Sequence, residues 1–400
     1  MRIGGVEMLA ERLSEVEVQR KKGAYPSRIG IPLNDLKRRY DSIQPEIEVV
    51  VAQVMASGWY VLGPQVEAFE REFAAYTGTA DCVGVANGTD ALEIALQVIG
   101  VAHGEEVITV ANAGMFSTSA IRSIGAVPVF AEIDPNTLTL NPAAAEHAIS
   151  TRTRAMIVTH LYGRMAHMPA LRELADRHAL ALIEDCAQAH GARSEGIMAG
   201  AWGDIGCFSF YPTKNLGALG DAGAIVTRGR QYAERARLLR QYGWTRKYEA
   251  HLPGGRNSRL DELQAAVLRA QLPYLEVWNQ ARQAIGDRYT RGLAGTGLRL
   301  PEMGRPGEMV YHLYVVRSSS QRDLLRAGLL KRRIGCEVHF PTPDYLQPAC
   351  ATLGYMSGAL PITEQAAREV LSIPCFPELT SAEVDQVCEA IKEVINGGCR

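Results

Sequence analysis

A single lysine stands where an apolar run of the sequence breaks into a glycine-spaced loop. The run covers residues 205–210 (IGCFSF), and Lys214 follows it, ahead of Gly217, Gly220 and Gly223. Burial at the end of a strand would remove the amine from water, which lowers its pKa and makes it nucleophilic. The plain alternative is a surface lysine in a loop, and for a lysine taken alone this is the commoner case.

A carboxylate and a glycine with a neighbouring hydroxyl follow two other apolar runs. Asp185 follows residues 180–184, where a buried carboxylate is costly unless it has a partner such as a protonated ring nitrogen. Gly88 and Thr89 follow residues 82–86, at the start of a predicted helix. Backbone amides and the positive end of the helix dipole suit a phosphate there, although an ordinary helix cap explains the same residues.

One ligand would use all of these groups together. Phe116, beyond the run at 106–110, offers a flat face, and Ser209 lies at the end of the run that precedes Lys214. Pyridoxal 5′-phosphate needs a lysine for its aldehyde, an acid for its ring nitrogen, amides and hydroxyls for its phosphate, and a surface for its ring. The sequence therefore predicts a pyridoxal-phosphate site with Lys214 and Asp185 at its centre.

Short apolar runs separated by helical patterns are expected to position these groups. The runs are rich in Val and Ile and do not alternate with polar residues, as expected of strands buried on both faces. They cover residues 82–86, 106–110, 127–131, 155–159, 180–184, 205–210 and 223–227. Strands and helices in turn predict a largely parallel α/β sheet with helices on both sides, whose ligands bind beyond the carboxyl ends of the strands.

The chain is longer than one hydrophobic core usually covers. We expect an N-terminal extension at 1–28, a large cofactor-binding domain at 29–275 and a small α+β domain at 276–400. Predicted helices lie at 229–241, 259–273, 275–293 and 321–330, with two more near the C-terminus. Two strands of the small domain are predicted at 311–317 and 335–340.

Composition argues against several classes of protein. The formal net charge is −2 with no long basic run, so nucleic acid and anionic membranes lack an electrostatic partner here. No stretch of about 18 apolar residues could cross a bilayer. The eight cysteines form no CxxC pair and no zinc spacing, and the charged N-terminus differs from a signal peptide. We expect a cytoplasmic protein without a metal site.

Beyond these residues, the chain resembles the DegT family of nucleotide-sugar aminotransferases, which are pyridoxal-phosphate enzymes of fold type I. The resemblance extends from about residue 30 to residue 380. It is carried by GPQVEAFEREFAAYTG, VANGTDAL, FAEIDPNTL, THLYGRM, IEDCAQAHGA, FSFYPTKNLGALGDAGAIVT and NSRLDELQAAVL. It implies a mixed, mostly parallel seven-stranded sheet flanked by helices, with a smaller C-terminal α+β domain.

The resemblance also implies a role for individual residues. Lys214 would bind the cofactor aldehyde as a Schiff base and later move protons, and Asp185 would hold the proton of the ring nitrogen. Gln188 would lie near the ring hydroxyl, and Phe116 would stack on the ring. The phosphate site would consist of Gly88, Thr89, Ser209 and Asn257 of the partner subunit. An active unit with shared sites would then be at least a homodimer.

The sequence departs from the usual pattern of the family in the lysine loop and ahead of the stacking aromatic. Asp221, Ala222 and Gly223 stand where Glu-Gly-Gly is usual, and the segment VANAGMF lacks the usual proline. The change in the loop could tune the choice of substrate.

The implied reaction moves an amino group from L-glutamate to a keto sugar. The stretches SGWYVLG, VANGTDAL and the lysine loop look most like members that act on dTDP-linked 3-keto-6-deoxyhexoses. Members that act on 4-keto nucleotide sugars or on aminocyclitol ketones share nearly all of these residues, so these substrates remain alternatives. Candidate contacts to the sugar or its diphosphate are Tyr211, Trp244, Arg246 and His339, for which core packing or surface placement is an equal alternative.

Three other functional classes fit the sequence less well. Relatives that remove a sugar hydroxyl carry histidine where this chain has Lys214. A non-catalytic sensor of the cofactor or the sugar is expected to lose Lys214 or Asp185, and both are present. A nicotinamide oxidoreductase is expected to carry GxGxxG after its first strand, and this chain does not. His160 and His190 follow predicted strands, and we interpret them as residues behind the site or in the core.

Overall fold

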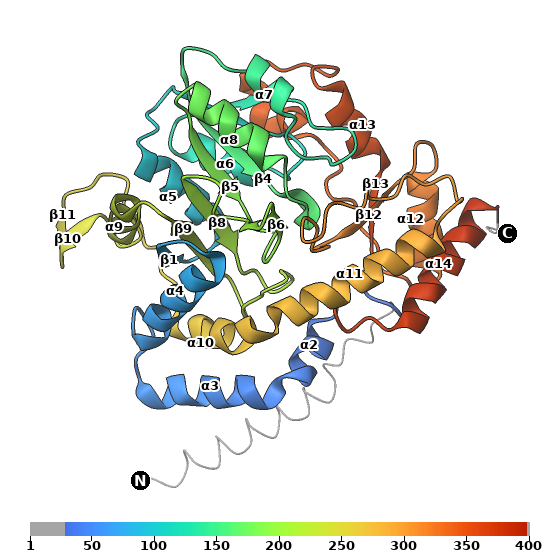
Figure 1. Cartoon of the computed structure of the whole chain (residues 1–400), viewed down its shortest axis with the longest axis horizontal. Coiled ribbons are helices and arrows are strands. Elements are labelled where there is room, and N and C mark those ends of the chain that lie inside the picture. The colour runs from blue at the N-terminus through green and yellow to red at the C-terminus, as the bar shows by residue number, and fades with distance from the viewer. Residues whose placement is uncertain (1–28, 398–400) are drawn as a thin grey trace, which may run out of the picture.

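A seven-stranded sheet forms the centre of the computed structural model, which describes residues 29–397 (Figure 1). Its strands are β1 (Asp81–Val85), β2 (Glu106–Thr109), β3 (Val127–Phe130), β4 (Thr153–Thr159), β5 (Ala181–Asp185), β8 (Ile205–Ser209) and β9 (Gly223–Thr227). The strand order is β1-β9-β8-β5-β4-β2-β3. Each strand falls on one of the seven predicted apolar runs, so the predicted mixed, mostly parallel sheet is confirmed.

Strand β9 is the exception to the parallel arrangement. It pairs antiparallel to β1 and to β8, whereas β8, β5, β4, β2 and β3 pair in parallel. The strands β1, β2, β4, β5 and β8 therefore all end at the same edge of the sheet. The loops that follow these ends carry the predicted site residues.

Apolar side chains of the strands are buried on both faces of the sheet. In β1, Cys82 belongs to one core cluster and Val83 to the other, and in β8 the same is true of Phe208 and Cys207. Helices cover the two faces, as Figure 1 shows. They are α4 (Pro64–Thr77), α5 (Gly88–Ile99), α6 (Phe116–Ser123), α7 (Pro142–His147), α8 (Met168–Arg177), α9 (Arg230–Leu239) and α10 (Glu262–Gln271). The N-terminal helix α3 (Gln44–Ser57) lies against α10, and α2 (Leu36–Ser42) contacts α3.

The C-terminal part of the chain, residues 276–397, builds a second core. The long helix α11 (Leu275–Gly292) contributes Ile285 and Tyr289 to this core, and the strands β12 (Tyr314–Arg317) and β13 (Val370–Ile373) pair antiparallel. Its other helices are α12 (Arg322–Lys331), α13 (Pro361–Glu369) and α14 (Ser381–Ile395). Ile31 also packs in this core. The division at 275 stays a prediction, and the extension at 1–28 lies outside the described residues.

The strand predicted at 335–340 is wrong. Only Glu337 of this segment forms a ladder contact, an isolated antiparallel bridge to Ser372. Pro341 and Pro343 follow at once, and proline cannot donate a ladder hydrogen bond. The partner of β12 is instead β13, whose four residues directly follow α13 and could not be distinguished from a continuation of that helix.

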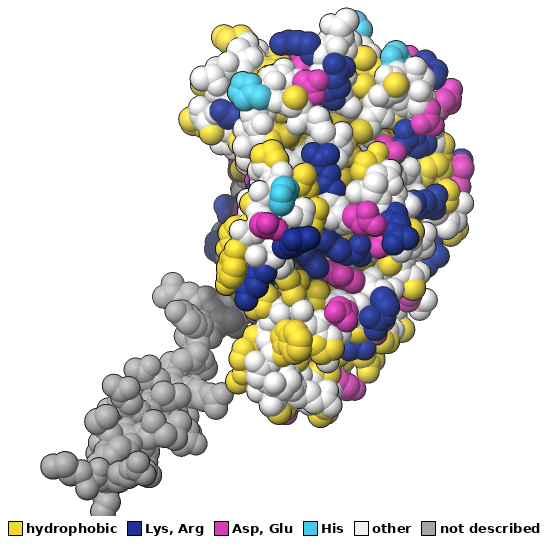
Figure 2. Space-filling view, turned by 90° about the vertical axis from the view of Figure 1, so that its left-hand side faces the viewer, with side chains coloured by type: hydrophobic (Ala, Val, Ile, Leu, Met, Phe, Trp, Pro, Cys, Tyr) yellow, Lys and Arg dark blue, Asp and Glu magenta, His cyan; other side chains and the backbone are white. Residues whose placement is uncertain are grey.

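Short hairpins and turns complete the fold. They include the strands β6 (Arg193–Ser194), β7 (Ile197–Met198), β10 (Trp244–Arg246) and β11 (Glu249–Ala250) and the 3₁₀ helices η1 (Leu161–Gly163), η2 (Leu272–Tyr274), η3 (Asp344–Leu346) and η4 (Pro348–Leu353). On the face shown in Figure 2, basic, acidic and apolar side chains are interspersed. Within residues 29–397, no helix combines the length and apolarity that crossing a bilayer requires.

Candidate active site

A cavity of about 370 Å³ opens at the edge of the sheet where the parallel strands end. Its walls follow the ends of β1, β2, β4, β5 and β8. The predicted site residues that line it are Gly88, Thr89, Phe116, Asp185, Gln188, Ser209, Tyr211 and Lys214. Residues up to 126 positions apart in the sequence, from Gly88 to Lys214, thus share one cavity.

Asp185 ends β5 and is buried. Its carboxylate accepts hydrogen bonds from the amide of Ala187 at 3.1 Å and, more weakly, from the hydroxyl of Thr159 at 3.4 Å. Burial raises the pKa of Asp185, while the Ala187 amide and the charge of Lys214 lower it. The carboxylate is incompletely compensated, and a protonated ring nitrogen in the cavity would supply the missing positive charge.

Lys214 lies half-buried in the cavity wall, in a loop that is anchored on both sides. Its amide donates to the carbonyl of Tyr211 at 2.8 Å, and its carbonyl accepts from Arg39 of α2 at 2.9 Å. Burial lowers the pKa of Lys214 to about 8, and the nearby charge of Asp185 opposes this shift. A large fraction of the amine is therefore neutral, and hence nucleophilic, in mildly basic solution.

The N-terminus of α5 forms a second side of the cavity. Asn87 caps this helix by accepting from the amide of Asp90 at 2.8 Å. A Cβ on Gly88 would come within 2.7 Å of the Cβ of Ser209, so only glycine allows the helix to start this close to β8. The exposed amides and the Ser209 hydroxyl make this side suitable for a phosphate.

Gln188 and Phe116 lie on two further parts of the wall. The side-chain carbonyl of Gln188 accepts from the amide of Tyr162 at 2.6 Å, which leaves its NH₂ group as a donor. The ring of Phe116 is half exposed and packs edge-on against Phe340, with 6.0 Å between the ring centroids. Both side chains are thus held by neighbours outside the cavity.

Four predicted site residues lie outside this cavity. Asn257 is exposed, and Trp244 packs against Tyr242 and Tyr248 in the β10–β11 region. Arg246 is exposed beside Glu249 of the same hairpin. The imidazole of His339 forms a hydrogen bond of 2.9 Å with the Ser372 hydroxyl. Their predicted roles in substrate or cofactor binding stay predictions.

Sequence reasoning missed Thr159 and Asn87, which line the cavity together with Asp221, a residue that the sequence analysis had connected only with the choice of substrate. Thr159 is the register partner of Asp185 on the neighbouring strand. Because it ends the predicted run at 155–159, its position beside a strand-end carboxylate was available as a signal. Asp221 lies in the lysine loop, where the sequence departs from the usual family pattern.

A cluster of possible metal ligands lies behind Asp185. Among residues 29–397, His160, Glu184 and Cys186 are the group whose ligand atoms lie within 4.8 Å of one another. Glu184 already accepts hydrogen bonds from His160 at 2.9 Å and from three backbone amides, those of Gly200, Trp202 and Gly203. A cation would have to displace these donors, so the cluster is a hydrogen-bonded anchor of the fold.

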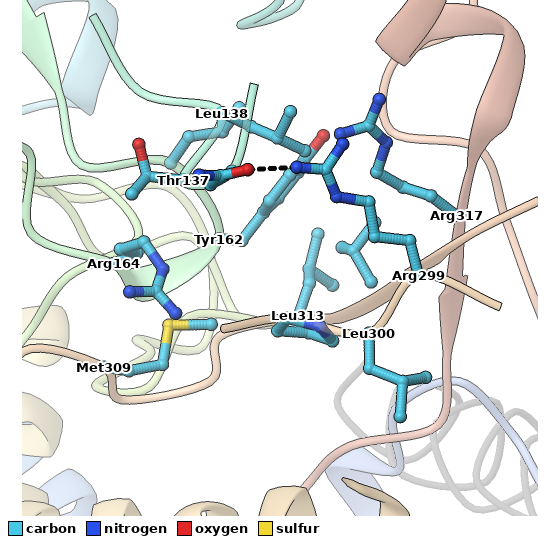
Figure 3. Close-up of a pocket in the computed structure, with 13 residues that line it drawn as sticks. Thr137, Leu138, Tyr162, Arg164, Arg299, Leu300, Met309, Leu313 and Arg317 are labelled. Atoms are coloured by element: carbon cyan, nitrogen blue, oxygen red, sulfur yellow. Dashed lines mark hydrogen bonds between the residues drawn. The ribbon is translucent and has the colours of Figure 1, made fainter. Parts of the chain in front are cut away.

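A smaller hollow of about 30 Å³ shares Leu161 with the cavity (Figure 3). Its arginines have partners within the protein. Arg299 donates to the side chain of Asn136, along the dashed line of Figure 3, and Arg164 donates to the Glu302 carbonyl. The hollow has room for about one water molecule. Its lining residues come from both the sheet region and the C-terminal part, so it lies at the contact between them.

Comparison with known proteins agrees with this geometry. The sequence model of the DegT/DnrJ/EryC1/StrS aminotransferase family matches residues 41–392. The dTDP-3-amino-3,4,6-trideoxy-alpha-D-glucose transaminase of Streptomyces venezuelae is 46% identical over 364 residues, which cover 91% of this chain and 96% of the relative.

Two solved structures extend the comparison. The crystal structure of S. venezuelae DesV in complex with a ketimine intermediate has a TM-score of 0.88 at 46% identity, covering 91% of this chain and 98% of that chain. The structure of NtdA from Bacillus subtilis with bound cofactor PMP has a TM-score of 0.84 at 30% identity, covering 89% of this chain and 82% of that chain. With its fold, its cavity and these matches over nearly its full length, the chain belongs to the DegT/DnrJ/EryC1/StrS aminotransferase family.

Proposed function

We propose that the chain uses pyridoxal 5′-phosphate to transfer an amino group from L-glutamate to a dTDP-linked 3-keto deoxysugar. The observation that carries the proposal is the meeting of Lys214 and Asp185 in one cavity. The chain belongs to an aminotransferase family, and its relative NtdA was solved with bound cofactor PMP, the amine form of pyridoxal phosphate. The S. venezuelae relative is named as a transaminase of a dTDP-linked 3-amino sugar, which supports the substrate class.

The cavity fits the proposed cofactor group by group. The buried Asp185 carboxylate, which lacks a full counter-charge, suits the protonated ring nitrogen. The amides at the start of α5 and the Ser209 hydroxyl suit the phosphate, and the free NH₂ of Gln188 suits the ring hydroxyl. Phe116 offers the face on which the ring would stack, and Lys214 offers the amine for the aldehyde.

Two residues would carry the chemistry. When bound, pyridoxal phosphate supplies an electron sink that stabilises negative charge at the carbon bearing the amino group. Asp185 would keep the ring nitrogen protonated. The Lys214 Nζ, once released, would take the α-proton from the amino donor and, in the second half of the cycle, give a proton to the sugar carbon that receives the nitrogen. Its pKa of about 8 suits both directions of transfer.

The position of the new amine tests the proposed substrate. We expect purified protein with pyridoxal phosphate and L-glutamate to aminate a 3-keto-6-deoxy dTDP-hexose at C3, which NMR of the product locates. A 4-keto dTDP-sugar and an aminocyclitol ketone are the parallel reactions, because these are the alternatives that the sequence leaves open. Amination of only one of these alternatives would refute the 3-keto assignment and leave the cofactor proposal standing.

We further propose a homodimer in which Asn257 of the partner subunit completes each phosphate site. Asn257 is exposed and lies outside its own cavity. Large apolar side chains such as Trp59 and Tyr248 are 58% and 77% exposed, which an interface would bury.

Mixing two variants, each with a defective active site, tests the shared site. Lys214→Ala and Asn257→Ala, mixed after reversible dissociation, should recover about one quarter of the wild-type activity, since half of the randomly formed dimers contain one intact site. The assay uses limiting pyridoxal phosphate, at which Asn257→Ala alone is expected to be weak. No recovery on mixing, or a monomer in sedimentation equilibrium, contradicts the shared site.

A further inference from the structure

The turn before α6 has an unusual conformation for its residues. Gly114 and Met115 both have left-handed backbones, with φ of 78° and 72°. A left-handed conformation is unfavourable for a residue with a Cβ such as Met115. Met115 is also the N-cap of α6, and its own side chain makes no capping hydrogen bond. Contacts from elsewhere must therefore hold the first turn of this helix.

The carboxylate of Asp344 supplies those contacts. It belongs to η3 in the C-terminal part, 229 residues after Met115, and is buried with 1% of its surface exposed. One oxygen accepts from the amide of Met115 at 3.0 Å, and the other accepts from the hydroxyl of Thr118 at 2.6 Å. Burial raises the pKa of Asp344 to about 6, while bonds from Thr118, Met115 and Gly114 lower it. The C-terminal part thus caps α6 in place of a local side chain.

The Phe340 ring makes a second contact with the same turn. The Phe340 ring packs edge-on against the Phe116 ring, with planes inclined by 76°. A Cβ on Gly114 would meet the Phe340 ring at 2.8 Å, so the ring lies directly against the backbone of the turn. Phe116 is the first residue of α6, so its position is fixed by whatever holds the start of this helix.

We propose that Asp344 is a positioning residue for cofactor binding. By capping α6 from the C-terminal part of the chain, Asp344 orients the Phe116 ring toward the cavity. The inference rests on the proposed function, because it assumes that Phe116 stacks on the pyridoxal ring. Asp344 itself does not line the cavity. Its effect on cofactor binding therefore passes through the helix start and Phe116.

A double-mutant cycle on cofactor binding tests this coupling. The dissociation constant of pyridoxal phosphate is measured with the apoprotein by titration of its absorption spectrum, using wild type, Asp344→Ala, Phe116→Ala and the double variant. Loss of the cap should weaken binding about tenfold in the wild-type background. In the Phe116→Ala background the same change should alter binding less than about twofold, because the ring that Asp344 positions is absent.

Conservative variants separate positioning from folding. Asp344→Asn keeps an oxygen for the Met115 amide, and its NH₂ can donate to Thr118, so binding should stay within about threefold of wild type. If Asp344→Ala fails to fold, Thr118→Val removes one bond and leaves the carboxylate in place, and it should show the same non-additivity with Phe116→Ala.

Glu132 provides a matched control. Its carboxylate accepts from the amides of Ile362 and Thr363, both at 2.9 Å, at the start of α13. The contact joins the same two parts of the chain, but none of its three residues lines the cavity. Glu132→Ala should lower the melting temperature and leave the dissociation constant within about twofold of wild type.

Three outcomes decide between the proposals. Wild-type protein that does not bind pyridoxal phosphate contradicts the proposed function. Wild-type protein that binds it, together with Asp344→Ala that binds equally well or loses as much affinity without Phe116 as with it, contradicts the positioning role alone. Non-additive loss that Asp344→Asn largely restores and Glu132→Ala does not reproduce supports the inference.

Discussion

Replacing Lys214 with alanine lowers the rate of amino transfer by about 10⁴-fold or more and removes covalent retention of pyridoxal phosphate. The amine has two proposed roles, as partner of the aldehyde and as the group that moves protons, and loss of the second alone costs about 10²–10⁴-fold. Turnover is measured with L-glutamate and the keto sugar, and retention is measured by visible absorbance after gel filtration. Variant protein with wild-type turnover contradicts the assignment.

The pH dependence of cofactor capture separates this role from a folding defect. In the wild-type apoprotein the capture rate should rise about tenfold per pH unit up to about pH 8 and then level off, because only the neutral amine attacks the aldehyde. The Lys214→Ala protein should not show this rise of the capture rate with pH. Lys392→Ala is the matched control, since Lys392 lies partly exposed on α14, outside the cavity, and forms an ion pair with Glu389.

Removing Glu184 has the largest expected effect on stability. Its side chain is fully buried and accepts four hydrogen bonds, from the amides of Gly200, Trp202 and Gly203 and from the His160 ring. Glu184→Ala leaves these donors buried without an acceptor, so we expect the free energy of unfolding to fall by about 3–5 kcal/mol. Urea unfolding of the apoprotein at fixed protein concentration measures the loss.

Two other variants serve as references for the loss of stability in Glu184→Ala. Glu184→Gln keeps one acceptor oxygen but turns an NH₂ group toward other donors, so an intermediate loss of about 1–3 kcal/mol is expected. Glu146→Ala breaks an exposed ion pair with Arg177 at 2.8 Å, and should lower the free energy of unfolding far less than Glu184→Ala does. A Glu184→Ala protein as stable as Glu146→Ala would show that the donors find water or other acceptors.

The sheet could be predicted from the sequence because its strands are buried on both faces. Such strands appear as continuous apolar runs, and all seven coincide with strands of the structure. The C-terminal part was harder. The run at 335–340 has the composition of a strand but ends at prolines, and β13 follows α13 without an intervening turn residue to mark the change. Both errors arise where local pattern does not reveal which segment supplies the pairing partner.

The residues of the cavity that lie at strand ends could be predicted from the sequence. Asp185 and Ser209 end two strands and Lys214 follows one of them, all at one edge of the sheet, so their meeting needed only the parallel arrangement. The contacts behind them could not be derived in this way. The capping of α6 by Asp344 joins residues more than two hundred positions apart, and no periodicity in either segment records it. The roles of Asn257 and His339 also depend on surfaces that strand order does not define.

The reversed direction of β9 has a practical consequence for engineering. Ser209 and Gly223 are paired residues of the neighbouring strands β8 and β9. The loop between them therefore begins and ends at adjacent positions of the sheet. We expect that replacing this loop by that of a relative, with Lys214 kept in place, leaves the register of the sheet unchanged, because the paired ends Ser209 and Gly223 stay in place.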